Sequence, residues 1–224
     1  MDLDFTDEQD MLRKAVRSLC EDAAETVRQL ENDPRGYDDG FWQKLVSMGL
    51  CGLMVPEAYG GSAMGLLDAV VVYEEFGRSL VPSPHLASSV VSAGVLMAGG
   101  SDAQRNTWLT RIASGEAILS PAWLEPDGGF GPAGVRVEAA PDGDGVTLTG
   151  TKRHVAFAAS VDRLVVLARE PAGVSLFLVD PRATGVTLSQ QLSVASDTQY
   201  RVDFDEVRVA DGDQIGRASC RERV

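Results

Sequence analysis

The stretch IASGEAI, residues 112–118, divides the sequence into two parts with different hydrophobic patterns. Before it, apolar residues recur three or four positions apart, which is the spacing of one face of an α-helix. After it, short apolar runs and apolar–polar alternation predominate, which is typical of β-strands. A run of helices followed by a run of strands predicts an α+β protein with two segregated domains rather than an alternating α/β sheet.

The first part contains two helix-start signals of the same kind. Residues 6–9 (TDEQ) and 101–104 (SDAQ) have the spacing of a capping box, in which each terminal side chain bonds the backbone of the other residue. The first box opens a helix with apolar residues from Leu12 to Leu30, and Pro34 and Gly36 end it. Further helices are expected over residues 41–48, 66–76 and 86–97 and after residue 101.

The second part contains four segments with strand patterns, separated by Pro- and Gly-containing turns. They are residues 146–149, 163–167, 174–179 and 201–205. We therefore expect an N-terminal all-α helical domain over residues 1–116. A small antiparallel β-barrel or β-sandwich domain should follow over residues 117–213.

Composition excludes several classes of protein. The formal net charge of −13 argues against a nucleic-acid partner, which needs a basic surface. Three cysteines without CxxC spacing and two histidines give no disulfide framework or metal site. The longest apolar stretch, residues 86–98, is too short for a membrane span, and the acidic N-terminus lacks a signal peptide. We expect a cytoplasmic protein, and the 17 arginines among 20 basic residues suggest a GC-rich bacterial source.

The loop VPEAYGG, residues 55–61, lies between two of the expected helices. Taken alone it is a turn, because Pro56 restricts one backbone dihedral while the following glycine pair frees others. Together with LVSMGL (residues 45–50) and the helix over 67–76, it resembles the VPExYGG region of acyl-CoA dehydrogenases. Similar scaffold segments, FLVD at 177–180 and DFDEVRV at 203–209, extend that resemblance through the chain.

The segment AILSPAWLEP, residues 117–126, resembles the strand and loop of that family which hold the pyrimidine ring of the flavin. The resemblance implies cofactor contacts at Trp123 and Leu124, although Leu124 stands where the family has Thr. It implies a substrate contact at Phe130, which stands where the family has a Ser against the coenzyme A arm. Backbone donors survive such changes, whereas each lost side-chain hydrogen bond is worth roughly 0.5–1.5 kcal/mol.

The segment GTKRHVA, residues 150–156, resembles the family's NGTKxWITN strand beside the flavin. The resemblance implies two further cofactor-binding positions, His154 in place of Trp and Ala156 in place of Thr. His154 presents an imidazole to the flavin in one interpretation; in the other it is a strand histidine satisfied by a neighbour. The match to GxGxxG at residues 129–134 is not a dinucleotide fingerprint, since a strand pattern rather than a helix follows it.

The resemblance implies an FAD-dependent oxidoreductase that converts an acyl-CoA to a trans-2-enoyl-CoA in fatty acid or lipid catabolism and passes electrons to an electron-transferring flavoprotein. In the family, a Glu in a C-terminal helical bundle removes the α-proton, and that bundle also builds a homo- or hetero-oligomer. The sequence stops before that bundle, so we expect no catalytic residue here and an inactive fragment. Glu57 and Glu125 match scaffold positions.

Two alternatives remain open, because Leu124, Phe130 and Ala156 all lose polar contacts. The chain would then belong to a non-catalytic or half-site subunit of a heteromeric dehydrogenase. It could also belong to a flavin monooxygenase or oxidase on the same scaffold. Residues 214–224 are expected to be a non-native tail, since residues 215–224 resemble the in-frame translation of a sequencing-library adapter; the alternative is a genuine basic tail.

Overall fold

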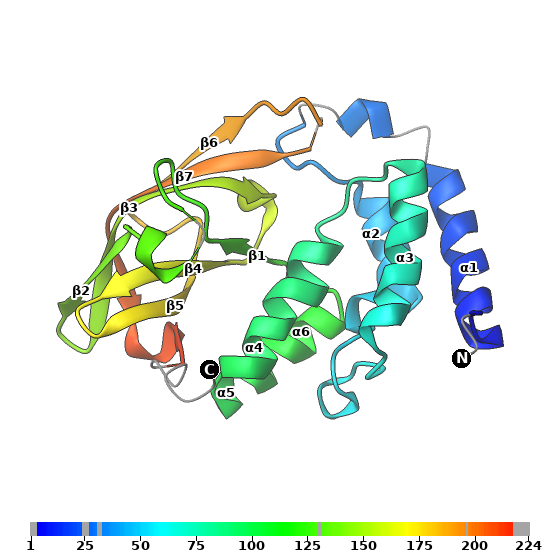
Figure 1. The fold of residues 1–224 in the computed structure, drawn as a ribbon, viewed down its shortest axis with the longest axis horizontal. Coiled ribbons are helices and arrows are strands. Elements are labelled where there is room, and N and C mark those ends of the chain that lie inside the picture. The colour runs from blue at the N-terminus through cyan, green and yellow to red at the C-terminus, as the bar shows by residue number, and fades with distance from the viewer. Residues whose placement is uncertain (1–3, 24–26, 31–32, 130, 196, 217–224) are drawn as a thin grey trace.

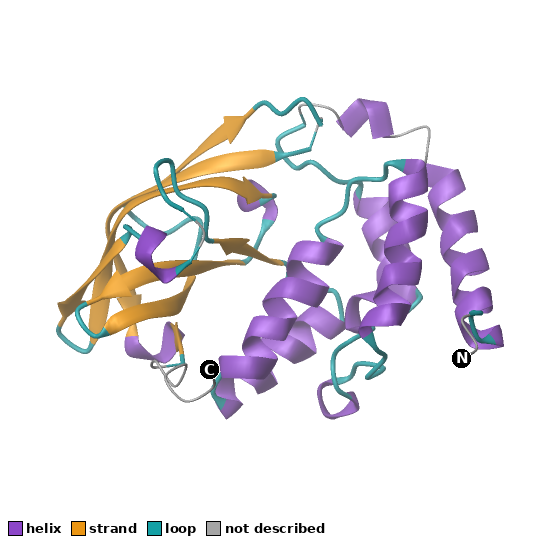
Figure 2. Cartoon of the chain, viewed as in Figure 1, coloured by secondary structure: helices purple, strands orange, loops and turns teal. Residues whose placement is uncertain are grey.

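The computed structural model describes residues 4–23, 27–30, 33–129, 131–195 and 197–216. Helices gather on one side of the molecule and strands on the other, and the chain crosses once from the first group to the second (Figure 1, Figure 2). The fold is therefore α+β, as the change of pattern at residues 112–118 predicts.

The helical part begins with three α-helices. They are α1 (Asp7–Ala23), α2 (Asp39–Ser47) and α3 (Leu66–Ser79), with 3₁₀ turns at Val27–Leu30, Leu50–Gly52 and Glu57–Tyr59. The first expected capping box is confirmed, because the Thr6 N–H donates to Gln9 Oε1 at 3.1 Å and the Gln9 N–H donates to Thr6 Oγ1 at 3.2 Å. The predicted helix up to Leu30 is divided, since residues 27–30 form a 3₁₀ turn that places Val27 and Leu30 on one side.

Two further helices complete the helical part, and both contain a π-helical turn. The first comprises η4 (Leu86–Ser92) and α4 (Ala93–Gly99). The second comprises α5 (Asp102–Gln104), η5 (Arg105–Leu109) and α6 (Thr110–Ala113). The second capping box is also confirmed, with Ser101 N–H to Gln104 Oε1 at 2.9 Å and Gln104 N–H to Ser101 Oγ at 3.2 Å.

The strands form one 8-stranded sheet in the order β6-β7-β3-β2-β4-β5-β8, with β1 beside β4. Their bounds are β1 Leu119–Ala122, β2 Glu138–Asp142, β3 Gly145–Ala156, β4 Arg163–Glu170, β5 Gly173–Val179, β6 Val186–Gln191, β7 Gln199–Ala210 and β8 Gln214–Ile215. All four predicted strands are present. Pairing is mainly antiparallel, but β1 runs parallel to β4 and one parallel bridge joins Glu138 to Arg169.

The hydrophobic core extends across the boundary between the helical part and the strands. One cluster joins Leu45 and Phe76 of the helices to Val155 and Phe204 of the strands. A second joins helical residues such as Leu109 to strand residues that include Ile215 at 2% exposure. Ile215 thus pairs with β5 although it falls in the expected non-native tail. The origin of that tail and the domain boundary at residue 116 both remain predictions.

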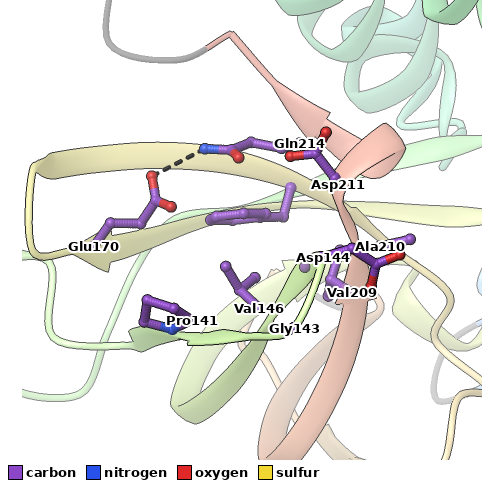
Figure 3. A pocket seen from close by; sticks show the side chains of 11 residues that line it. Pro141, Gly143, Asp144, Val146, Glu170, Val209, Ala210, Asp211 and Gln214 are labelled. Carbon is purple, nitrogen blue, oxygen red and sulfur yellow. Dashed lines mark hydrogen bonds between the residues drawn. The ribbon is translucent and has the colours of Figure 1, made fainter.

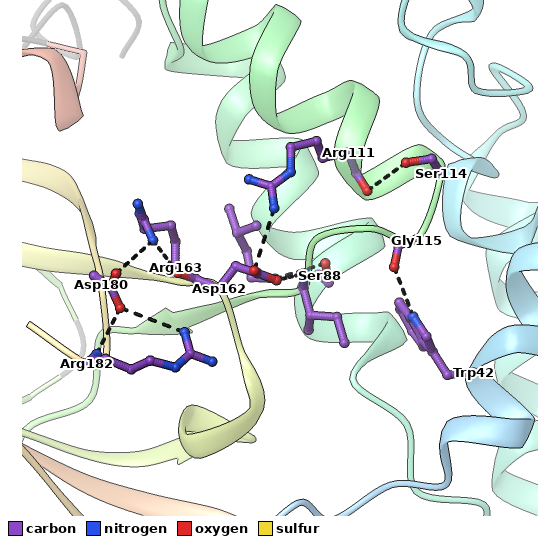
Figure 4. Close-up of polar contacts among 11 residues, drawn as sticks. Trp42, Ser88, Arg111, Ser114, Gly115, Asp162, Arg163, Asp180 and Arg182 are labelled. Carbon is purple, nitrogen blue, oxygen red and sulfur yellow. Dashed lines mark hydrogen bonds and ion pairs between the residues drawn. The ribbon is translucent and has the colours of Figure 1, made fainter.

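Polar contacts reinforce the connection between the helical part and the strands (Figure 4). Asp162 Oδ2 accepts from the Ile118 N–H at 2.9 Å, and the Arg111 guanidinium lies 3.6 Å from Asp162 Oδ1. Ser88 Oγ accepts from the Leu119 N–H at 3.1 Å, which ties η4 to the start of β1. These bonds satisfy backbone donors that enter the buried junction, so the start of β1 is fixed from both sides.

The helical part buries a carboxylate, Glu75, and an imidazole, His85. Glu75 on α3 receives two bonds from Arg17 on α1, Nε to Oε2 at 2.9 Å and a terminal guanidinium nitrogen to Oε1 at 2.8 Å. These bonds from Arg17, opposed by burial and helped by the charges of Arg17 and Arg78, lower the pKa of Glu75. His85 is fully buried, with Nε2 2.8 Å from Leu50 O and Nδ1 2.7 Å from the Tyr73 hydroxyl.

These partners settle the protonation state of His85. A carbonyl oxygen only accepts, so Nε2 carries the hydrogen and Nδ1 accepts from the Tyr73 hydroxyl. Burial lowers the pKa of His85, against the smaller opposite effect of the Leu50 carbonyl. His85 is therefore a neutral, fully hydrogen-bonded core residue.

Candidate functional site

The two segments with the predicted flavin contacts meet where the turn after β1 crosses β3. The Arg153 N–H donates to Leu124 O at 2.9 Å. The Lys152 ammonium lies 2.5 Å from Glu125 Oε1 and makes a longer contact of 3.4 Å with Trp123 O. Trp123 and Leu124 thus lie beside Lys152 and Arg153, which directly precede His154, although about thirty residues separate the two segments in sequence.

The Lys152–Glu125 pair is enclosed. The side chains of Lys152 and Glu125 are 0% and 4% exposed. Glu125 also accepts from the Arg136 N–H at 2.8 Å and the Val137 N–H at 3.2 Å, so its carboxylate joins three chain segments. Burial lowers the pKa of Lys152, while the bond and charge of Glu125 oppose that shift.

A cavity of about 480 Å³ lies beside this crossing. Its lining is mostly apolar: Trp123, Leu124, Glu125, Gly129, Gly131, Pro132, Gly134, Val135, Leu167 and Val174. The wall formed by Gly129, Gly131, Pro132 and Gly134 depends on glycine, because a Cβ on Gly134 would lie 2.1 Å from Gly129 O. An apolar cavity with a few polar groups at its edge is the usual form of a small-molecule site.

His154 is held in an uncommon backbone conformation next to the crossing. Its φ of 53° lies in the left-handed region, within the register shift between Lys152 and Val155 in the β3–β7 pairing. Its N–H donates to Gln191 Oε1 at 3.0 Å, and its Nδ1 lies 2.7 Å from Gln199 Oε1. Because a side-chain carbonyl only accepts, Nδ1 carries the hydrogen of this bond. Such strain in a non-glycine residue is often found at functional sites.

The remaining predicted positions have different settings. Ala156 ends β3, is partly buried and pairs with Gln199, so it offers no side-chain hydrogen bond where the family pattern has one. Trp123 is 47% exposed and Leu124 partly buried. Phe130, the predicted substrate contact, lies outside the described residues.

Sequence reasoning missed the residues that hold the site together. Gln191 and Gln199 fix His154, and the partnership of Glu125 with Lys152 was not anticipated. A signal for the second was present: Lys152 is one of three lysines in an Arg-rich chain, in the middle of a strand pattern. A lysine at a buried position requires a carboxylate partner.

The GxGxxG stretch is followed by a strand, as its sequence pattern predicts. Pro132–Gly134 forms a single 3₁₀ turn, and β2 rather than a helix follows. No helix end is therefore available here to hold a pyrophosphate.

A second cavity, of about 530 Å³, lies at the other end of β3 (Figure 3). Phe177, Val146 and Val209 line it, and Glu170 accepts from the Gln214 side chain at 2.9 Å across its edge. It shares no lining residue with the first cavity and contains none of the predicted site residues. We therefore place the candidate site at the crossing.

Within the described part of the chain, no helix combines the length and apolar character that crossing a membrane requires. Nor do three or more His, Cys, Asp or Glu side chains gather there in a group that could hold a metal ion. Cys20 and Cys51 are buried free thiols.

Comparison with known proteins gives matches along most of the chain. The family model described as acyl-CoA dehydrogenase, N-terminal domain, matches residues 6–116, and the middle-domain model matches residues 120–207. Acyl-CoA dehydrogenase FadE27 of Mycobacterium tuberculosis is 30% identical over 201 residues, which cover 90% of this chain and 52% of that protein. The chain thus spans about half the length of the curated relatives it matches.

Solved structures agree with these matches. A chain of the ChsE4-ChsE5 complex from Mycobacterium tuberculosis has a TM-score of 0.87 at 29% identity, covering 97% of this chain and 59% of that one. A variant of the Tcur3481-Tcur3483 steroid ACAD has a TM-score of 0.83 at 31% identity, covering 94% and 57%. The chain belongs to the acyl-CoA dehydrogenase family, whose N-terminal-domain and middle-domain models match residues 6–116 and 120–207.

Proposed function

We propose that the whole protein to which this chain belongs oxidises an acyl-CoA to a trans-2-enoyl-CoA with FAD and passes the electrons to an electron-transferring flavoprotein. The family membership supports the class of reaction. The observation that carries the proposal to this chain is the convergence of the two flavin-contact segments at the Lys152–Glu125 crossing.

The crossing fits a flavin. The Leu124 carbonyl is occupied by the Arg153 N–H, whereas the Leu124 N–H makes no hydrogen bond within the residues that the structure describes. A free backbone donor beside an apolar cavity and a half-exposed indole suits a flat ring with polar edge atoms. FAD, when bound, supplies the acceptor for the hydride that leaves the acyl chain.

The residues of this chain would bind and orient that cofactor. The Leu124 N–H would donate to the pyrimidine edge, and Trp123 and His154 would present aromatic faces to the ring. His154 keeps one orientation because Gln191 holds its backbone and Gln199 its imidazole. Ala156 would fill space without a hydrogen bond.

Neither Glu125 nor Glu57 suits the role of α-proton base. Glu125 is engaged by Lys152 and two backbone donors, so its carboxylate is held as the anion of a buried ion pair and is poorly placed to take up a proton. Glu57 lies on an exposed turn in the helical part and lines neither cavity. We therefore place the base in sequence that follows the regions matched here, as in the family.

The second candidate function is a half-site or non-catalytic subunit of a heteromeric dehydrogenase. It is favoured by Leu124 and Ala156, which lack the hydroxyl groups of the family pattern, and by the likeness to a chain of the ChsE4-ChsE5 complex. The likeness to a steroid ACAD also makes a steroid-derived acyl thioester the first substrate to try.

The experiment is reconstitution from the uninterrupted gene. The protein is purified alone and together with the product of the adjacent gene, and flavin absorbance, enoyl-CoA formation and oxygen consumption are measured with straight-chain, branched and steroid-derived acyl-CoAs. Flavin and enoyl-CoA from the protein alone support the first function, and activity with the partner alone supports the second. Flavin-free protein with no enoyl-CoA in either preparation would contradict both, and oxygen consumption would indicate an oxidase.

A further inference from the structure

We propose that Lys152 is a positioning residue, whose buried ion pair with Glu125 sets the course of residues 123–125 along the 480 Å³ cavity. The identity of the cavity's ligand as FAD rests on the proposed function. The positioning of the turn does not, because it follows from contacts within the chain.

Stability alone does not explain this pair. Both charges are withdrawn from water, and the desolvation of two buried ions often exceeds their mutual attraction. Apolar residues of similar volume often give equal or greater stability at such positions. A fully enclosed pair therefore indicates that the turn of residues 123–125 must follow one fixed course. Hydrogen bonds within an ion pair fix the orientation of the groups they join, and an apolar contact does not.

The course of the turn is fixed by contacts of Glu125 on both of its sides. On one side Glu125 accepts from Lys152 of β3. On the other it accepts from the N–H groups of Arg136 and Val137, which lead into β2. A carboxylate with partners in two separate segments cannot shift without breaking a bond to one of them.

Because Glu125 is fixed, the neighbouring residues Trp123 and Leu124 are held in place as well. Trp123 O lies 3.4 Å from the Lys152 ammonium, and Leu124 O accepts from the Arg153 N–H at 2.9 Å. With both carbonyls turned toward β3, the Leu124 N–H is left without a partner in the described chain, and the Trp123 side chain remains exposed. Lys152 thus acts on the cavity through the turn and does not line the cavity itself.

The chain contains a built-in reporter for the turn. Trp42 and Trp108 are 3% and 7% exposed, whereas Trp123 is 47% exposed. Acrylamide quenching of tryptophan fluorescence therefore reports mainly Trp123, and a Trp123→Phe variant isolates its share of the signal. This readout requires no flavin and no catalytic activity.

Three variants of the 224-residue chain separate position from stability. Lys152→Met removes the ammonium and leaves Glu125 buried without its partner. The double variant Glu125→Gln with Lys152→Met removes both charges and keeps one side-chain oxygen, which can accept from either the Arg136 or the Val137 N–H. Arg153→Met is the matched control, because it removes an exposed neighbouring cation but leaves the backbone bond to Leu124.

Both Lys152 variants should change the quenching constant of the Trp123 component by about twofold or more, while Arg153→Met leaves it unchanged. FAD titrated into the same proteins should bind about tenfold more weakly to both Lys152 variants, as expected for one or two lost or misplaced hydrogen bonds.

A double variant that recovers wild-type quenching would overturn the proposal, because the pair would then matter for stability only. A double variant that does not fold would overturn it as well, since the pair would be needed by the fold itself rather than by the turn. If wild-type chain does not bind FAD, the proposed flavin site fails, but the quenching series still decides the role of Lys152.

Discussion

The helical and strand regions each bury a carboxylate against a cation, but they do so in different ways. Glu75 on α3 has a side chain that is 1% exposed, yet the Arg17 side chain that pairs with it is 41% exposed. In the strand region, Lys152 and Glu125 are 0% and 4% exposed. A cation that keeps its water loses little solvation free energy, whereas two enclosed ions depend wholly on each other.

This difference separates a pair that joins two helices from a pair that fixes a turn. Arg17 can swing into solvent if Glu75 is lost, and the two helices retain their apolar contact. Neither Lys152 nor Glu125 can reach solvent if its partner is lost, because both side chains are enclosed. Changes to the two pairs should therefore differ in their cost to stability, with Lys152 the more costly to lose.

Lys152→Met should produce the largest loss. It leaves the Glu125 carboxylate buried without its cation, and breaking a buried pair in this way costs about 3–5 kcal/mol of unfolding free energy. Urea unfolding followed by far-UV circular dichroism measures it. Addition of Glu125→Gln should recover part of that loss, and an effect of the single variant no larger than that of Lys44→Met, an exposed cation on α2, would remove the contrast.

Glu75→Gln should lower the midpoint of thermal unfolding by a few degrees. We expect this shift to be smaller than the one that Lys152→Met causes in the same measurement. The arginine bonds hold the pKa of Glu75 below its usual value, so this carboxylate adds stability above its ordinary pKa of 4.5, and that stability is lost as the pH falls through the lower folded-state value. The difference between wild type and Glu75→Gln should therefore shrink in acid. A gap that stays constant from neutral pH to pH 3 would contradict this account.

His85 gives the helical region a pH dependence of its own. Burial lowers the pKa of His85 in the folded state, so below about pH 6.5 the unfolded chain binds a proton that the folded chain does not. The unfolding free energy should fall by up to about 1.4 kcal/mol per pH unit in that range. Urea unfolding between pH 7.5 and 5 measures the slope.

His85→Gln is the control for this slope, because Gln keeps a donor for Leu50 O but does not titrate. Its unfolding free energy should vary less between pH 7.5 and 5 than that of wild type. Equal slopes in the two proteins would show that another group is responsible.

Ser120→Ala should have the smallest effect and the opposite sign. Ser120 in β1 is fully buried, and its hydroxyl has no hydrogen-bond partner among the residues described. Removal of an unsatisfied polar group relieves its desolvation, so we expect a change between zero and about 1 kcal/mol in favour of the folded state. A clear loss of stability in urea would mean that the hydroxyl has a partner, such as an internal water.

Much of the fold could be predicted from local patterns. The capping boxes at Thr6 and Ser101 and the four strand segments all have the conformation that short-range preferences favour. The parallel pairing of β1 with β4 could not be predicted, because Leu119–Ala122 pairs with residues more than forty positions later. Such a pairing depends on the packing of both segments, and the sequence contains no local signal for it.

The candidate site was predictable to a smaller extent. The segments around Trp123 and His154 were identified by resemblance, and their roles remain proposals. The contact of Lys152 with Glu125 and the hold of Gln191 and Gln199 on His154 were not foreseen. A glutamine that fixes a distant histidine has the same local pattern as a glutamine exposed to solvent.

The order of helices and strands, the change of pattern at residues 112–118 and membership of the family can be inferred from the sequence. These features depend on periodicity and on motifs within short windows. Only the folded arrangement shows that Glu125 and Lys152 share an enclosed site and that Glu75 and Arg17 share an open one. Burial is set by what packs around a residue, and a charged side chain has the same letter in either place.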